Sequence, residues 1–302
     1  MRKITLIMTV VFLLLMASCQ KTATSINSAK DVIITAAISG DGVTRALDDY
    51  GDGGNVTRCV LEVYDSTGEK YARIVEPYDV ECNSAIFSLR LVTTQNYEVV
   101  VWADCGGGED FLEDKYYTTI DGLTQVKIIS HIGNNDELDA FYAMRELAID
   151  NTSDFSMVLT RPLGQLSVMT KLTDVELDSM TPDSVNITYS ATIPTTFNAL
   201  NGESDTSSRT SATWSAKVAD AVVDLDGYMH LLTDYIFAND TDMLTSFSVD
   251  FVNANGDIIT TNSNFSQIPI HRNMRTIVKG ELLTKESEIL VSLDPTFEDG
   301  EE

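Results

Sequence analysis

Residues 155–171 read FSMVLTRPLGQLSVMTK, and this stretch shows the pattern that decides the fold. Phe155–Thr160 and Gly164–Lys171 are both short runs in which apolar and small polar residues interchange. Runs of this length and composition are typical of β-strands. Arg161-Pro162-Leu163 separates them, so the stretch predicts two short strands rather than one long element.

The same pattern continues in both directions along the chain. Val56–Asp65 and Ala85–Val92 alternate apolar and polar residues, and Asp31–Ser39 is rich in β-branched residues. About a dozen such runs, spaced roughly ten residues apart, predict antiparallel β-sandwiches. The remaining runs are Tyr97–Ala103, Leu123–Ser130, Ser184–Ser190, Tyr228–Phe237, Leu244–Val252, Asp257–Thr261, Asn273–Leu283 and Glu288–Leu293.

Helical patterns are scarce. Only Glu137–Glu146 and Leu172–Met180 have the character of short helices. No alternation of strands with helices is present, which argues against a doubly wound nucleotide-binding fold. The sequence therefore predicts an all-β protein.

The charge balance excludes one class of partner. The chain has 302 residues with 46 Asp and Glu against 20 Lys and Arg, a formal net charge of −26. A surface this acidic repels phosphate backbones, so we expect no nucleic-acid partner. The apolar fraction of 43% is ordinary for a folded core.

The first residues carry an export signal. Arg2 and Lys3 precede the apolar run Ile4–Met16, which is too short for a permanent membrane span. Ala17-Ser18 then leads into Cys19, an order similar to a bacterial lipobox. We predict a signal peptide over residues 1–18, acylation (palmitate type) of Cys19 and a flexible tether over residues 19–30. The alternative is an ordinary signal peptide with an incidental Cys19.

The remaining cysteines and histidines form no recognisable site. Cys59 lies in an apolar run and is expected in the core. Cys82 and Cys105 lie beside turn-like segments and could pair, but their spacing cannot establish it. The histidines have no ligand spacing and would reach a metal only if the fold brought them together with other ligands. They are His131, His230 and His271.

Catalytic signatures are missing, and we predict no enzyme, no metal and no cofactor. The chain has no GxSxG, GxxxxGK[ST] or GxGxxG pattern, so a secreted hydrolase has no supporting motif. Asp48–Asn55 superficially suggests calcium binding but lacks the ligand order of an EF-hand, so a solvated loop is expected. Three Asp-Ser-X triplets resemble the O-glycosylation motif of exported Bacteroidales proteins. Their serines are Ser66, Ser179 and Ser184.

One break in composition marks a candidate boundary. Residues 201–213 read NGESDTSSRTSAT, with one apolar residue, Ala212. This segment is either a long exposed hairpin loop or a linker, and we place the boundary there. The expected organisation is a first domain over residues 31–200 and a second over residues 201–302.

Taken in order, four features resemble the fimbrillin-like lipoproteins of Bacteroidales, which are related to type V pilus subunits. The leader ends in Ser18-Cys19, and a β run is followed by Thr44-Arg45-Ala46 in an Asp/Gly-rich loop. Leu159–Val168 (LTRPLGQLSV) and Ile268–Leu283 (IPIHRNMRTIVKGELL) are framework patterns. None of the four is a catalytic motif. The short acidic tail after the last strand departs from the stalk-subunit pattern and leaves a tip, anchor or non-polymerising role open.

The resemblance implies a fold and an assembly mechanism. The implied fold is two transthyretin-like sandwich domains in series, exported to the outer membrane and exposed at the cell surface. In polymerising members, an arginine-specific protease cuts early in the chain and removes the first strand. A terminal strand of another fimbrial subunit then fills the groove.

The residues of this chain fit that mechanism. Arg45-Ala46 is the implied cleavage site, although a solvent-facing loop arginine is the simpler alternative, and Arg58 is a poorer site because it lies in a strand. Glu288–Leu293 is the implied donor or capping strand. The residues of the strand to be replaced are Ile33, Ile34, Thr35, Ala36, Ala37 and Ile38.

A non-polymerising adhesin that binds host protein or glycan is the alternative function. Exposed aromatic platforms would favour it. Trp102 is embedded in an apolar run and is expected in the core, while Trp214 and Tyr228 are weak candidates beside polar segments.

Overall fold

The chain is almost entirely β-strand in the part that the computed structural model describes. That part comprises residues 28–39, 50–148, 154–171, 182–190, 193–205, 209–210, 213–218, 223–241, 243–284 and 289–294. It contains two short 3₁₀ helices, η2 (Leu123–Gln125) and η3 (Asp136–Leu138). No helix within these ranges is long and apolar enough to cross a membrane. The predicted all-β class is confirmed.

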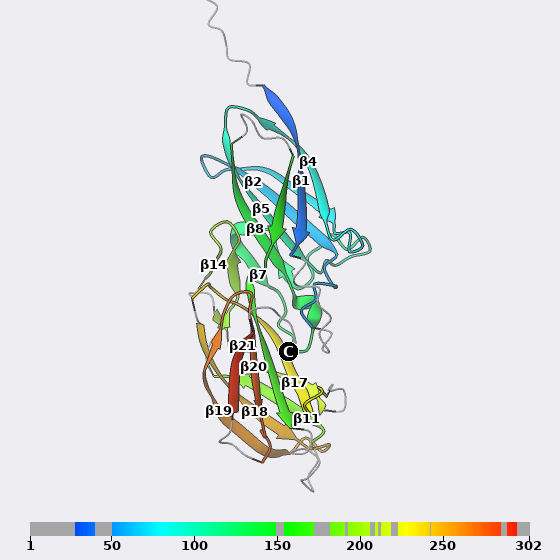
Figure 1. Cartoon of the computed structure of the whole chain (residues 1–302), viewed down its shortest axis with the longest axis vertical. Coiled ribbons are helices and arrows are strands. Elements are labelled where there is room, and N and C mark those ends of the chain that lie inside the picture. The colour runs from blue at the N-terminus through cyan, green and yellow to red at the C-terminus, as the bar shows by residue number, and fades with distance from the viewer. Residues whose placement is uncertain are drawn as a thin grey trace, which may run out of the picture.

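The first sandwich is built from a three-stranded and a four-stranded sheet (Figure 1). In the smaller sheet, β1 lies between an antiparallel neighbour and a parallel one. The side chains between the two sheets form one apolar core. The smaller sheet has the order β4 (Ala85–Val92), β1 (Ala29–Ile38), β9 (Phe155–Leu159), and the larger has the order β3 (Lys70–Pro77), β2 (Arg58–Asp65), β5 (Asn96–Asp104), β8 (Phe141–Ala148).

The second sandwich is built from two four-stranded sheets around a second core. Here β10 lies between antiparallel β17 and parallel β20. The first sheet has the order β17 (Tyr228–Phe237), β10 (Leu163–Lys171), β20 (Arg275–Gly280), β21 (Ile289–Asp294). The second has the order β16 (Thr213–Lys217), β11 (Ser184–Tyr189), β18 (Met243–Val252), β19 (Ile258–Ile270).

The two sandwiches repeat one strand order, although the sequence shows no internal repeat. The order β4-β1-β9 corresponds to β17-β10-β20, and β3-β2-β5-β8 corresponds to β16-β11-β18-β19. The parallel pairs β1–β9 and β10–β20 are the departures from the antiparallel pairing that the sequence predicts. Among the described strands, β21 has no counterpart in the first sandwich.

The chain passes from one sandwich to the other at residues 160–162, not at the composition break near residue 201. Strands β10 and β11, expected in the first domain, pair with β17 and β18 of the second sandwich. The described residues 193–205 and 209–210 instead form four short strands. One small sheet joins segments of both halves. It has the order β14 (Glu203–Ser204), β13 (Thr196–Asn198), β7 (Val126–Ile128), β6 (Tyr117–Thr118), and β12 (Ile193–Pro194) pairs with β15 (Arg209–Thr210) beside it.

A third apolar core connects the sandwiches, which lie end to end along the long axis (Figure 1). We call this region the domain joint. Trp102 lies at its centre, fully buried, with its ring against Tyr117 and Phe237. The apolar members of the joint are Val60, Tyr64, Val100, Trp102, Tyr117, Leu123, Val126, Leu138, Ala140, Leu163, Phe197, Ala199, Tyr235 and Phe237.

The predicted helix over Glu137–Glu146 is wrong. Its first two residues end η3, and the residues from Phe141 onward belong to β8, which pairs antiparallel with β5 along its whole length. The other predicted helix, Leu172–Met180, lies outside the described residues.

Candidate functional site

Strand β1 presents one face to the core and the other to solvent. Val32, Ile34, Ala36 and Ile38 point inward and are buried. Ile33, on the other face, is 42% exposed. The reason is that the sandwich has only two layers, and the outer face of its smaller sheet is uncovered at Ile33. We call the position that β1 occupies between β4 and β9 the β1 channel.

In the β1 channel, the main chain of β1 pairs with β4 along one edge and with β9 along the other. Eight residue pairs connect β1 to β4, from Ala29 opposite Val92 to Ala36 opposite Ala85. Five pairs connect it to β9. Where β9 is too short to continue, the Asp154 carboxylate accepts the N–H of Ile33 at 2.9 Å.

Two side chains hold the end of β1 at Ile38. The Tyr78 hydroxyl accepts the N–H of Ile38 at 3.2 Å and donates to Asn83 Oδ1 at 2.6 Å. Asn83 Nδ2 donates to the Ile38 carbonyl at 3.1 Å. Burial raises the pKa of Tyr78 to about 12, so its hydroxyl remains a proton donor at neutral pH. We call Tyr78 and Asn83 the clamp.

The local sequence explains the clamp geometry. Asp79 and Ser84 exchange two backbone hydrogen bonds, which close a short hairpin. Asn83 has φ 50, in the left-handed region where asparagine is tolerated better than most residues. Neither residue was predicted as functional, because the sequence around them signals only a turn.

The segment after the predicted cleavage site is bound to the domain joint. The Gly51 N–H donates to Asp136 Oδ1 at 2.7 Å, and Asn55 Nδ2 donates to Asp136 Oδ2 at 2.8 Å. The Tyr50 carbonyl accepts from Arg275 of β20 at 3.0 Å. Residues 50–55 are therefore not the simple solvated loop that their composition predicts. Arg45, Ala46, Asp48 and Asp49 lie outside the described residues.

A buried ion pair lies where the chain crosses between the sandwiches. Arg161 binds both carboxylate oxygens of Asp139, with Nε to Oδ1 and Nη2 to Oδ2 both at 2.8 Å. Arg161 also donates to the Gly51 carbonyl. Burial raises the pKa of Asp139 to about 6, which leaves the pair ionised at neutral pH. The motif Leu159–Val168 thus contains the crossover between the sandwiches, and the buried contacts of Arg161 hold this crossover in place.

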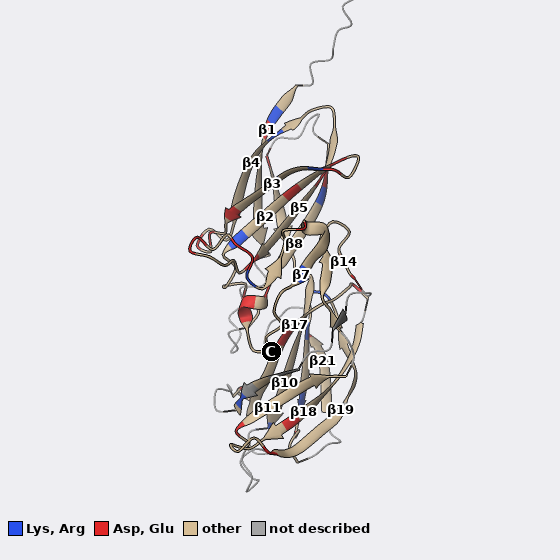
Figure 2. Ribbon diagram, turned by 180° about the vertical axis from the view of Figure 1, so that it is seen from behind, with Lys and Arg blue, Asp and Glu red and all other residues tan. Residues whose placement is uncertain are grey.

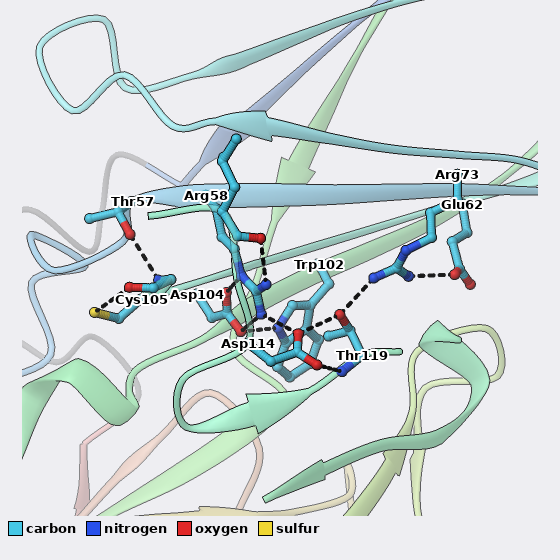
Figure 3. A network of polar contacts seen from close by, with 11 residues as sticks. Thr57, Arg58, Glu62, Arg73, Trp102, Asp104, Cys105, Asp114 and Thr119 are labelled. Carbon is cyan, nitrogen blue, oxygen red and sulfur yellow. Dashed lines mark hydrogen bonds and ion pairs between the residues drawn. The ribbon is translucent and has the colours of Figure 1, made fainter. Parts of the chain in front are cut away.

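A second buried network fixes the loop that follows β5 (Figure 3). Arg58 binds Asp104 at 2.6 Å and Asp114 at 2.9 Å, and it donates to the Leu112 carbonyl at 3.1 Å. Trp102 Nε1 donates to Asp104 at 3.0 Å. Burial opposes the charge of Arg58, but the Asp104 and Asp114 carboxylates outweigh it and raise its pKa. Since Arg58 is buried and doubly paired, it is not accessible to a protease.

The last strand is held on one edge only. β21 pairs with β20 and lies at the end of its sheet. Val291 lies opposite the buried Val278, which places Ile289, Val291 and Leu293 on the core-facing side. Even so, Val291 is 42% and Leu293 40% exposed. β21 is therefore the predicted strand Glu288–Leu293, shifted by one residue, and it is loosely covered.

The other predicted sites are dispersed. Ser66 is exposed in the turn between β2 and β3, Ser184 is half-buried at the start of β11, and Ser179 and Cys19 lie outside the described residues. All three described cysteines are free, with Cys59 and Cys105 buried and Cys82 exposed.

The histidines serve separate structural contacts. His131 Nε2 lies 2.8 Å from both carboxylate oxygens of Asp234, His230 contacts Thr233, and His271 contacts the Arg272 carbonyl. Across the described part of the chain, no three His, Cys, Asp or Glu side chains group as metal ligands.

Trp102 is fully buried, which confirms its expected place in the core. Tyr228 is half-buried beneath Lys171, and the side chain of Trp214 is not described. Acidic residues occur in both sandwiches (Figure 2).

Comparison with known proteins gives the family and the fold. Residues 23–302 match the model of a family of unknown function, DUF6562. The chain belongs to this family. A search of the curated proteins found no match.

Solved structures resemble this DUF6562 member over most of its length. A candidate adhesin from Bacteroides thetaiotaomicron has 13% identity and a TM-score of 0.51, with 89% of this chain and 98% of that chain covered. A candidate polysaccharide-binding protein from the same organism has 12% identity and a TM-score of 0.51, with 86% and 95% covered. The tip fimbrial protein Mfa3 from Porphyromonas gingivalis has 10% identity and a TM-score of 0.48, with 88% and 99% covered. The predicted likeness in fold to Bacteroidales surface proteins is confirmed.

Proposed function

We propose that this protein is a structural, fimbrillin-like surface protein that assembles by strand exchange after cleavage at Arg45-Ala46. One observation carries the proposal. β1 is the central strand of its sheet, it fills the core of the first sandwich, and only the segment that contains Arg45 connects it to β2. A single cut there would leave β1 held by hydrogen bonds and packing alone.

The arrangement around the cut supports the same proposal. Tyr50–Asn55 stays bound to the domain joint through Asp136 and Arg275, so the new chain end would remain in place when β1 leaves. The empty channel would expose a backbone edge on β4 and another on β9, which favours pairing with a strand of another chain. The donor is β21 of another subunit, because it has core-facing apolar residues and a single neighbour. The likeness in fold to a candidate adhesin supports a role at the cell surface.

Strand exchange is tested by processing the purified protein with an arginine-specific protease. We expect one early cut after Arg45, followed by an oligomer ladder that resists mild detergent. The Arg45→Ala variant should remain uncut at this position and monomeric. Light scattering and a denaturing gel follow the reaction. Cleavage at other arginines first, or a cut protein that stays monomeric, would contradict the proposal.

Membrane attachment is a separate part of the proposal. Acylation of Cys19 would tether the unprocessed protein to the outer membrane, and cleavage at Arg45 would release it into a fimbrium. In cells fed an alkyne fatty acid, we expect the wild-type protein to be labelled and the Cys19→Ala variant to be unlabelled. The matched Cys82→Ala variant should keep the label. Label retained by Cys19→Ala would rule out this attachment site.

A further inference from the structure

The hydrogen bonds of the clamp to β1 go only to its main chain. The Tyr78 hydroxyl and the Asn83 amide bind the N–H and the carbonyl of Ile38, and no part of these bonds involves its side chain. Together the two side chains replace a neighbouring strand at this point, where β4 has already ended its pairing at Ala85 opposite Ala36. The clamp therefore binds any residue that has an N–H and an extended backbone.

Resting on the proposed function, we infer that Tyr78 and Asn83 are positioning residues that grip the main chain of any strand in the β1 channel and set its register. Tyr78 is 7% exposed and packs in the core of the first sandwich, so its hydroxyl position is fixed. Asn83 is held at the end of the Asp79–Ser84 hairpin. The contact lies at the end of the channel from which the connection to Arg45 departs.

The clamp requires a residue with an N–H at the Ile38 position, and this requirement favours one register for β21 of a second copy. Its core-facing residues can occupy inward channel positions in steps of two. In this register Leu293 lies at the Ile38 position, where its N–H can donate to the Tyr78 hydroxyl. Val291 then lies at the Ala36 position and Ile289 at the Ile34 position. A shift of two residues places Pro295 at the clamp, and proline has no N–H to donate. The opposite shift places two polar residues in the core, Ser287 at the Ile34 position and Lys285 at the Val32 position, whereas the selected register places only Ser287 there, at the Val32 position.

The walls of the channel are compatible with that register. Ala36 lies between Ala85 of β4 and Met157 of β9, so Val291 would add two methyl groups there. Methionine adapts its shape more readily than other core residues. Leu293 in place of Ile38 conserves volume, and Ile289 replaces Ile34 without change.

Disulfide mapping tests the register in the protease-treated full chain. Directly opposed residues bring their Cα atoms within disulfide range, whereas residues displaced by two do not. We expect Val291→Cys combined with Ala85→Cys to give an intermolecular disulfide in the oligomer, located by mass spectrometry. Ile289→Cys and Leu293→Cys, each combined with Ala85→Cys, are the matched controls and should give at least tenfold less. A dominant disulfide from either control would overturn the register.

The clamp itself is tested by the rate at which cleaved β1 leaves the channel. Loss of a buried hydrogen bond to the strand should accelerate release about 5- to 10-fold in Tyr78→Phe. Tyr71→Phe is the matched control, because the Tyr71 hydroxyl binds the Arg90 carbonyl of β4 and not β1. Asn83→Gly, which retains the left-handed backbone, provides a second variant. Release at the wild-type rate in both clamp variants would overturn the inference. If wild-type protein releases β1 without forming oligomers, the proposed assembly fails while the clamp remains measurable.

Discussion

A chain that begins at Ala46 is expected to lose the first sandwich as a stable monomeric unit while it keeps the second. The deletion removes β1 from between β4 and β9 and takes three large buried side chains, Val32, Ile34 and Ile38, out of the core. At about 1.5–3 kcal/mol each, this loss of roughly 5–9 kcal/mol approaches the whole stability of a typical domain. The second sandwich has its own core and loses no strand.

Hydrogen exchange measures this result strand by strand. In dilute truncated protein, we expect amides of β2, β4 and β5 to exchange much faster than in a chain that begins at Ser28. Amides of β11 and β18 should remain protected. A synthetic peptide with the sequence of residues 30–39 should restore protection in β4. Unchanged protection of β4 in the truncated chain without peptide would show that β1 is dispensable and would contradict the channel.

Arg161→Met is expected to lower the free energy of unfolding by about 3–5 kcal/mol. The substitution leaves the Asp139 carboxylate buried without its bidentate partner, and burial already raises the pKa of Asp139 to about 6. The Gly51 carbonyl loses its donor as well. Chemical denaturation followed by tryptophan fluorescence measures the effect, because Trp102 lies in the domain joint.

Two further variants isolate the ion pair. Arg90→Met changes an exposed arginine of β4 and should alter the free energy of unfolding by less than about 0.5 kcal/mol. The double variant Arg161→Met, Asp139→Leu removes both charges and should recover part of the loss. An Arg161→Met protein as stable as Arg90→Met would show that the pair contributes nothing to the joint.

The sequence predicts where the strands lie better than it predicts which strands pair with one another. Tyr228–Phe237 is β17 as expected, and Asp31–Ser39 contains most of β1, because β-propensity and short apolar runs are local properties. Pairing is not local. The parallel neighbours β9 and β20 and the repeated strand order depend on contacts between distant segments. For the same reason the polar stretch 201–213 suggested a boundary that the sheets place at Arg161.

The candidate site was predictable in part. Strand β1 and its inward residues Ile34, Ala36 and Ile38 follow from composition and from the family resemblance. The clamp does not, because Tyr78 and Asn83 are ordinary turn residues until the fold brings them to Ile38. The prediction of a solvated loop is wrong for residues 50–55 for a related reason. An Asp/Gly-rich segment is usually solvated, but Asp136 and Arg275 bind its backbone here.

The repeated strand order limits the number of other molecules that each molecule can bind during assembly. β10 is the counterpart of β1 in the second sandwich, yet all its residues except Lys171 are buried, and the crossover before it is held by the buried Arg161. A protease that frees β1 therefore has no equivalent target before β10. Under the proposed assembly, each molecule would offer one vacant β1 channel and one donor strand, β21, and would be a bifunctional unit. Such units would add head to tail, so the product would be an unbranched thread whose length depends on the supply of processed subunits and on whatever caps its end.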